Sequence, residues 1–112
     1  MLMETRDVGA VRVVRLTGAL DAVASGEVRK QLSELVRDGV MRLVIDLEGV
    51  NRIDSTGLGA LVTTLKAARD RGGELVLASL TPSVRTVVEL TRLHRIFDIY
   101  DDADAAATEL AR

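Results

Sequence analysis

The chain has 112 residues and a formal net charge of −2, and 29% of its residues are charged. This length and balance are typical of a single globular domain over residues 1–112 and not of a disordered chain. With no cysteine, the sequence excludes disulfides, thiolate catalysis and Cys-based metal sites, and without a basic block it argues against nucleic acid as the main partner.

Aromatic residues are nearly absent, since Phe97 and Tyr100 are the only two. The core must therefore be built from Val, Leu, Ile and Ala. No apolar run approaches the roughly 20 residues that span a bilayer. The N-terminus also lacks the basic-then-apolar pattern of a signal peptide. We expect no membrane partner and a cytoplasmic location.

The first part of the chain alternates between strand and helix patterns. Residues 1–7 predict either an edge strand or a loose segment, and residues 11–16 carry the β-branched residues of a strand. A turn is predicted over residues 17–21, with its bend at Gly18. From residue 24 to residue 38, apolar side chains recur at the spacing of one helix face.

The rest of the chain continues this alternation. Residues 40–47 are almost continuously apolar, as in a strand covered on both sides, and residues 75–80 predict another strand. Threonine followed by proline at residues 81–82 predicts a capped helix start. A short strand over 96–100 and an alanine-rich helix over 103–110 follow. Strands that alternate with helices predict an α/β fold with mostly parallel pairing.

Residues 50–65, V-N-R-I-D-S-T-G-L-G-A-L-V-T-T-L, form the junction around which the chain is organised. A helix cap alone explains one polar residue there and stabilises a helix by about 1 kcal/mol. The junction instead has three polar residues, at 54–56, and then Gly57 and Gly59, each of which costs about 1 kcal/mol relative to Ala within a helix. Small residues keep a hydroxyl accessible, and a helix N-terminus favours phosphate. We therefore predict that Ser55 is a phosphate acceptor.

A catalytic serine is a poor alternative. A nucleophile elbow needs G-x-S-x-G, but the residue two before Ser55 is Ile53. A catalytic triad also needs a base, and the single histidine, His94, lies about 40 residues away in the sequence. We expect no catalytic residues.

Cofactor and metal motifs are also weak. The pair of glycines at residues 57–59 begins a dinucleotide fingerprint, but its third glycine position is Val62. Asp46, Glu48 and Asp54 could suggest a divalent metal, yet their spacing matches no ligand motif. We expect neither a cofactor nor a metal.

The runs I-D-L-E-G-V at residues 45–50 and I-D-S-T-G-L-G at residues 53–59 resemble the signature of the STAS domain, in its anti-sigma-factor antagonist branch. Supporting segments occur in the expected order at residues 16–21, 72–75, 90–93, 96–97 and 99–100. The resemblance implies a small, mostly parallel sheet with an N-terminal edge strand and about four helices largely on one side.

The resemblance also implies a regulatory binding protein and not an enzyme. It assigns the phosphoacceptor role to Ser55, with Thr56 as a minor alternative. The unphosphorylated antagonist binds an anti-sigma factor serine kinase, which then releases its sigma factor. Phosphorylation inactivates the antagonist, and a PP2C-type phosphatase resets it. The alternative is a STAS scaffold or a subunit of a stress-sensing or lipid-transport complex.

The expected partner surface surrounds Ser55. Its residues are Gly18, Asp21, Asp54, Thr56, Gly57, Leu58 and Gly59. Three positions depart from the family's usual pattern. Ala19 removes a carboxylate from the early turn, Ala24 replaces a common helix cap and predicts a loose helix start, and Arg92 replaces a common glycine, so that a left-handed cap there would be strained or absent.

Overall fold

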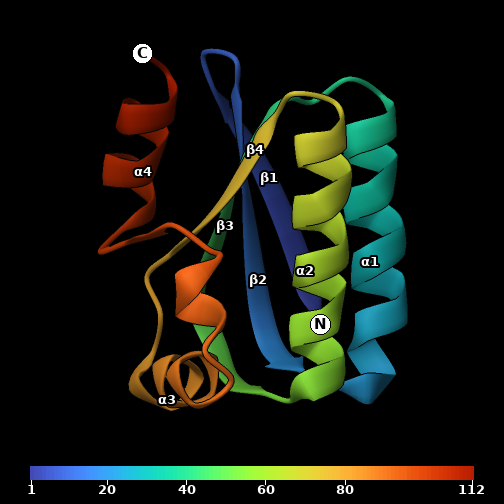
Figure 1. Cartoon of the computed structure of the whole chain (residues 1–112), viewed down its shortest axis with the longest axis vertical. Helices are drawn as coiled ribbons and strands as arrows, with labels where there is room; N and C mark the ends of the chain where they lie inside the picture. The colour runs from blue at the N-terminus through green and yellow to red at the C-terminus, as the bar shows by residue number, and fades with distance from the viewer.

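One five-stranded sheet, in the order β1-β2-β3-β4-β5, organises the chain. The computed structural model describes all residues from Met1 to Arg112 (Figure 1). β1 runs antiparallel to β2, and every other neighbouring pair is parallel. The elements are β1 (Leu2–Val8), β2 (Val11–Leu20), α1 (Ala22–Arg37), β3 (Arg42–Ile53), α2 (Ser55–Asp70), β4 (Glu74–Ala78), α3 (Pro82–Leu90), the 3-10 helix η1 (Leu93–Arg95), β5 (Ile99–Tyr100) and α4 (Ala103–Leu110). The predicted α/β class, edge strand and mostly parallel sheet are confirmed.

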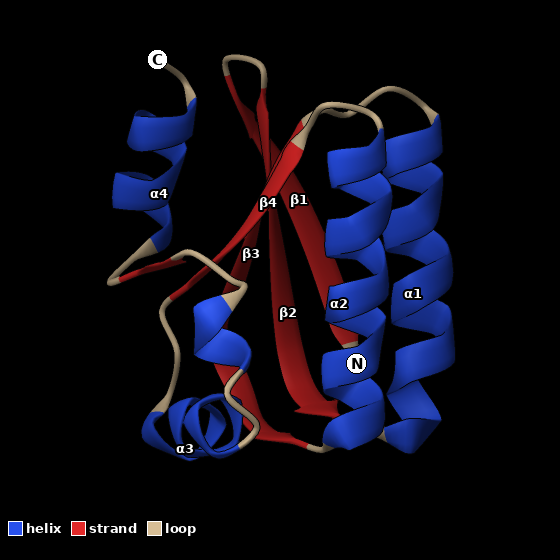
Figure 2. Cartoon of the chain, in the orientation of Figure 1, coloured by secondary structure: helices blue, strands red, loops and turns tan.

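The helices form two unequal layers. α1 and α2 lie side by side on one face of the sheet, α3 packs into the same core, and α4 covers the opposite face (Figures 1 and 2). Successive side chains of a strand point to opposite faces, so β3 contributes to both cores. Leu43 and Ile45 lie in the larger core, and Val44 packs in the α4 cluster. The prediction that helices lie largely on one side is confirmed, with α4 as the exception.

Helical spacing determines which side chains α1 and α2 bury. Val28, Leu32 and Val36 of α1 recur every four residues and are buried. α2 buries Leu61 and Leu65 in the same way. Each such aliphatic side chain stabilises the fold by roughly 1.5–3 kcal/mol when fully buried. This stripe fixes both helices on the sheet and thereby positions their N-termini.

β2 is longer than the sequence predicts. The prediction of a turn at residues 17–21 is wrong, because β2 continues through most of this segment to Leu20. The ladder with β3 shifts its register near this point, including between Gly18 and Ala19. Gly18 has a φ of +117°, a conformation that favours glycine. Gly18 therefore lets the strand absorb an irregularity without reversing direction.

Two boundaries in the second half also differ from expectation. Thr81 precedes α3 but makes no side-chain cap; its hydroxyl donates to the Val50 carbonyl of β3 at 2.8 Å. The hydroxyl thus joins the start of α3 to the end of β3. The strand predicted over 96–100 is reduced to β5, because η1 precedes it and Phe97 turns into the core.

Arg92 follows the C-terminal end of α3 in the left-handed conformation. Its φ is +61° and its ψ is +17°, the region in which glycine is common after helices. The sequence left open whether such a turn is strained or absent here. The turn is present and a side-chain-bearing residue occupies it, so it carries conformational strain.

Candidate functional site

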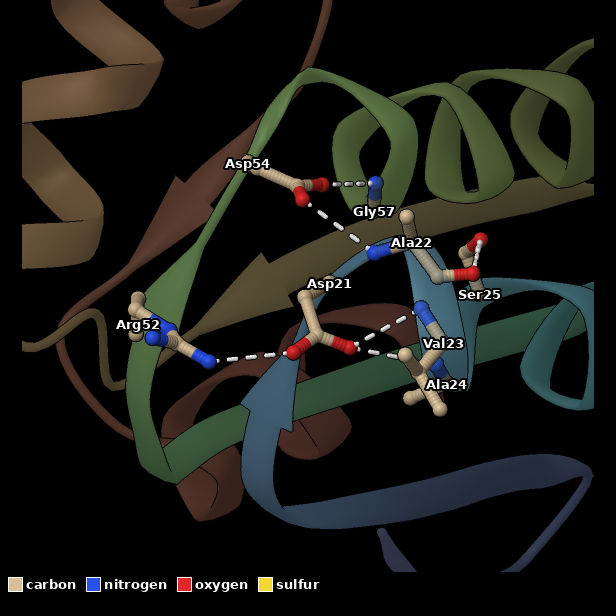
Figure 3. Close-up of polar contacts among 8 residues, drawn as sticks. All are labelled: Asp21, Ala22, Val23, Ala24, Ser25, Arg52, Asp54 and Gly57. Atoms are coloured by element: carbon tan, nitrogen blue, oxygen red, sulfur yellow. Dashed lines mark hydrogen bonds and ion pairs between the residues drawn. The ribbon is translucent and has the colours of Figure 1, made fainter.

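The site lies where two neighbouring parallel strands, β2 and β3, end and the helices that follow them, α1 and α2, begin. β2 ends at Leu20 and β3 ends at Ile53, and these two residues are paired in the sheet. α1 begins at Ala22 and α2 at Ser55, each two residues after its strand ends. Figure 3 shows the two helix starts next to each other. The positive ends of two helix dipoles therefore lie together at the carboxyl ends of β2 and β3.

Asp54 connects the two helix starts. Its Oδ1 accepts a hydrogen bond from the Gly57 backbone N–H at 2.9 Å, which caps α2. Its Oδ2 accepts from the Ala22 backbone N–H of α1 at 3.1 Å (Figure 3). Because the first N–H groups of a helix lack partners within it, one carboxylate satisfies donors of both helices.

Asp21 is the cap of α1. Its Oδ1 accepts from the backbone N–H groups of Val23 and Ala24, at 3.1 and 3.2 Å. Its Oδ2 accepts from the Arg52 guanidinium at 3.0 Å. The Ala24 N–H is the largest cause that lowers the pKa of Asp21 below 3.8; the Val23 N–H and the Arg52 charge lower it further, while partial desolvation opposes them. The expectation of a loose start near Ala24 is wrong, because Asp21 supplies the cap.

Ser55 is the first residue of α2 and is exposed. The capping bonds of this turn go to the Asp54 carboxylate, so they leave the Ser55 hydroxyl free. Thr56, the next residue, is also exposed. An exposed, uncommitted hydroxyl at a helix N-terminus is open to an enzyme that approaches from solvent. The structure thus places Ser55 directly after Asp54, whose carboxylate reaches the start of α1 next to Asp21.

Two of the residues expected on the partner surface are buried. Leu58 is only 2% exposed and packs in the larger core. A Cβ at Gly57 would lie 2.1 Å from the Leu20 carbonyl oxygen, so this glycine lets α2 approach β2 closely. Because Gly57 and Leu58 are buried, neither is placed to contact a partner directly. Both residues instead position their exposed neighbours on α2. Gly18 is partly buried within β2.

Gly59 differs from Gly57, because a Cβ there would meet no atom within 4 Å. It is exposed on α2, one turn beyond Ser55. Gly26 occupies the corresponding position of α1, five residues after its cap, and it too has open space around it. Packing therefore explains neither glycine, although each destabilises its helix.

Sequence reasoning missed three exposed residues beside the two caps, Asp21 and Asp54. Ala22 and Val23 begin the first turn of α1, and Val23 is 92% exposed. Arg52 projects from the end of β3 to Asp21 (Figure 3). These three residues, with Asp21, Ile53 and Asp54, line a shallow surface depression. The aspartate at position 21, followed by an apolar residue at position 23, was the available signal for a helix start there.

The sequence of this chain matches the STAS domain family over residues 3–106. The chain belongs to the STAS family. It is 35% identical to an anti-sigma F factor antagonist of Paenibacillus polymyxa, over 89% of this chain and 86% of that protein. This relative identifies the branch of the family as the anti-sigma factor antagonists.

Solved structures have the same fold. A crystal structure of an anti-sigma factor antagonist from Mycobacterium paratuberculosis has a TM-score of 0.87 at 26% identity and covers 99% of this chain and 94% of its own. The phosphorylated form of the Bacillus cell fate determinant SpoIIAA has a TM-score of 0.75 at 21% identity, over 99% of this chain and all of its own. The STAS fold is confirmed, and so is the resemblance to the anti-sigma factor antagonists that the sequence motifs indicated.

Antagonists of this STAS branch are regulatory proteins without enzymatic activity. The carboxylates considered for a metal are dispersed: Asp46 and Glu48 face Arg15, while Asp54 caps α2. No group of three or more His, Asp or Glu side chains is arranged to hold a metal ion. None of the helices has the length and apolar character needed to cross a membrane.

Proposed function

We propose that this protein is a phosphorylation-switched antagonist of an anti-sigma factor that is itself a serine kinase. The unphosphorylated protein binds the kinase, and the kinase releases its sigma factor. Transfer of phosphate from ATP to Ser55 ends the association, and a PP2C-type phosphatase restores the binding form. Sigma factors act in the cytoplasm, and the antagonist acts there with them, without binding nucleic acid or a membrane.

The free Ser55 hydroxyl is the observation that carries this proposal. Ser55 is exposed at the first position of α2, and the cap next to it is made by Asp54. A kinase needs its acceptor hydroxyl in solvent and not committed to the fold. Some other hydroxyls are committed to the fold: the Ser83 hydroxyl donates to the Asn51 carbonyl, and the Thr81 hydroxyl donates to the Val50 carbonyl. The Thr56 hydroxyl, like that of Ser55, makes no such bond, so the kinase assay includes both positions.

The surface around Ser55 suits a partner that approaches closely. Thr56 and Gly59 are exposed on α2, and Ala22 and Gly26 are exposed on α1. Small side chains allow backbone of another protein to approach both helices. Val23 adds an apolar side chain that is 92% exposed, and burying it on a partner would contribute up to roughly 2 kcal/mol. A partner that covers this surface also covers Ser55.

Electrostatics explain how phosphate would end the association while the fold persists. A phosphoserine carries about −1.5 to −2 charges, and Asp21 and Asp54 already lie on this surface. The positive ends of α1 and α2 offset the added charge within the antagonist. A partner surface that fits the unphosphorylated, uncharged Ser55 does not supply such compensation for the negative charge of the phosphate. The switch therefore needs no rearrangement of the chain.

The chain itself supplies no catalytic group for the transfer. The kinase brings the nucleotide, Mg²⁺ and the base that takes the Ser55 proton. The antagonist contributes the acceptor oxygen and a rigid presentation by Asp54. This division of roles fits the absence of a histidine or cysteine beside Ser55 in the sequence.

Kinase assays test the acceptor. The protein is incubated with candidate anti-sigma kinases and ATP, and the phosphate is located by mass spectrometry. We expect one phosphate on Ser55, none on Ser55→Ala, and unchanged labelling of Thr56→Ala. Robust labelling of Ser55→Ala would move the acceptor elsewhere, with Thr56 the first position to examine.

A second experiment separates charge from loss of the hydroxyl. Ser55→Asp and Ser55→Asn have nearly the same shape, but only the first adds a negative charge. We expect Ser55→Asp to bind the kinase about 100-fold more weakly, which corresponds to about 3 kcal/mol, and Ser55→Asn to bind nearly as well as wild type. Both variants should unfold at the wild-type temperature. Equal binding by the two variants would contradict the electrostatic switch.

A further inference from the structure

β1 leaves one edge of the sheet open. This seven-residue strand pairs with β2 along its whole length, with no register shift and neither proline nor glycine. β2 is the only element that packs extensively against it. Proteins usually protect a regular edge strand with a bulge, a proline, short length or a cover, because its free N–H and C=O groups can pair with another strand. β1 has none of these four protections. Charged side chains also protect edge strands, but the charges of β1, on Glu4, Arg6 and Asp7, are of both signs and can pair with a second copy.

Both faces of β1 are also accessible. On the α1 side, a groove of about 360 Å³ separates the strand from the helix, with Thr5 and Lys30 among its lining residues. On the α4 side, a cavity of about 390 Å³ is lined by Glu4 and Arg6 of β1 together with residues of β2 and β3. A neighbouring strand therefore has room for its side chains above and below the sheet.

The sequence of β1 limits how a second copy could pair with it. A two-fold axis perpendicular to the sheet keeps each side chain on its own face, so opposed residues must have numbers of the same parity. Centring the pair on Glu4 sets two carboxylates against each other, and centring it on Arg6 sets two guanidiniums against each other. Centring it on Thr5 sets Glu4 of each copy against Arg6 of the other.

The Thr5-centred register is also complementary at its ends. Leu2 lies opposite Val8 of the second copy, and both are apolar; Leu2 is 55% exposed in the single chain. Met3 lies opposite Asp7, and the two Thr5 residues lie on the axis. Apolar pairs, opposite charges and Thr–Thr pairs each stabilise antiparallel strands. This register uses all seven residues of the strand.

We propose that two copies of this chain associate through β1, antiparallel and centred on Thr5, so that their sheets become one continuous sheet. The Arg6–Asp104 ion pair, 2.7 Å long, does not oppose this arrangement. A guanidinium has five donors, so Arg6 can keep Asp104 and also bind Glu4 of the second copy. The contact is small, so the dimer exchanges with monomer in a concentration-dependent equilibrium.

Sedimentation of charge variants tests the register. Glu4→Arg places Arg against Arg at both symmetric pairs, and we expect it to raise the dimer dissociation constant by about tenfold or more. The double variant Glu4→Arg/Arg6→Glu restores opposite charges and should recover the wild-type constant; the Asp104 side chain is 86% exposed, so loss of its ion pair with Arg6 matters little. Glu89→Arg on exposed α3 is the control for net charge and should behave as wild type.

Cross-linking tests the axis. The chain has no cysteine, so Thr5→Cys introduces a single thiol that faces its own copy across the two-fold axis. We expect Thr5→Cys to form a disulfide-linked dimer under mild oxidation much faster than Thr108→Cys, which is exposed on α4. A monomer at every concentration with equal cross-linking of the two variants, or a dimer that is indifferent to Glu4→Arg, would overturn the proposal. Ser55→Asp should leave dimerisation unchanged, so this result is independent of the proposed kinase switch.

Discussion

The Asp54 carboxylate accepts a hydrogen bond from the backbone N–H of Ala22, 3.1 Å away, although 32 residues separate them in the chain. The same carboxylate caps α2 through the Gly57 N–H. The residue that precedes the proposed phosphoacceptor therefore fixes the start of α2 against the start of α1. The exposed residues of both helices depend on it for their relative position.

We expect Asp54→Ala to lower the free energy of unfolding by about 2 kcal/mol, because it removes hydrogen bonds to two helix N-termini. Asp102→Ala is the matched control, because Asp102 caps only α4 and accepts a side-chain hydrogen bond from one N–H group, that of Ala105. We expect about 1 kcal/mol for that variant. Urea unfolding measures both. Equal losses would mean that the bond to Ala22 contributes nothing.

The two glycines of the motif should respond to alanine in opposite directions. Gly57→Ala forces a methyl group to within 2.1 Å of the Leu20 carbonyl oxygen, and we expect it to destabilise the protein by about 2–3 kcal/mol. Gly59→Ala adds a methyl group in open space and should stabilise α2 by about 1 kcal/mol. Thermal unfolding of the two variants checks this; destabilisation by Gly59→Ala would contradict the exposed position.

Gly59→Ala also distinguishes a partner contact from a structural position. If a partner's backbone approaches α2 at Gly59, the added methyl group weakens kinase binding while it stabilises the free protein. Thr63→Ala, one turn farther along the exposed face of α2, is the control for a change outside the surface around Ser55. Titration calorimetry with the kinase measures both, and wild-type affinity for Gly59→Ala would exclude close approach there.

Local patterns predict the turn that carries the proposed phosphoacceptor because the residues that form this turn are adjacent in the sequence. Asp-Ser-Thr-Gly follows a buried strand and places the cap, the hydroxyl and the close-packed glycine within four residues. The structure shows how three of them differ: Asp54 is occupied by capping, the Ser55 hydroxyl is free, and Gly57 is buried against β2. Residue types alone could not separate these roles.

Contacts between distant segments could not be predicted in this way. The Asp54–Ala22 bond exists because Leu20 and Ile53 are neighbours in the sheet, and no local pattern contains that pairing. Thr81 looked like a helix cap, but its hydroxyl donates to the carbonyl of Val50, which β3 brings within 2.8 Å. In both cases a tertiary partner determines which hydrogen bond a polar side chain makes.

The left-handed turn after α3 offers a stabilising substitution. Arg92 has a φ of +61°, a region where a side chain is strained and glycine is not. We expect Arg92→Gly to raise the free energy of unfolding by about 0.5–1 kcal/mol. Arg92→Ala removes the same side chain but keeps a Cβ, so it should leave stability nearly unchanged. Chemical unfolding measures both, and equal stabilisation by the two variants would attribute the effect to the arginine side chain instead of the backbone.

The cap of α1 should make stability depend on pH at acidic values. The pKa of Asp21 is lowered from 3.8 chiefly by the Ala24 N–H, with the Val23 N–H and the Arg52 charge also lowering it. A carboxyl whose pKa is lower in the folded state stabilises the protein above its unfolded pKa, and this contribution is lost as the pH falls through the folded pKa. Asp21→Asn keeps an acceptor oxygen but does not titrate. We therefore expect the stability difference between wild type and Asp21→Asn to shrink as the pH falls from about 5 to about 3, measured by urea unfolding at each pH. Arg52→Ala removes only an exposed ion pair and should retain most of this pH dependence. A difference that stays constant across the range would show that the carboxylate charge does not stabilise the start of α1.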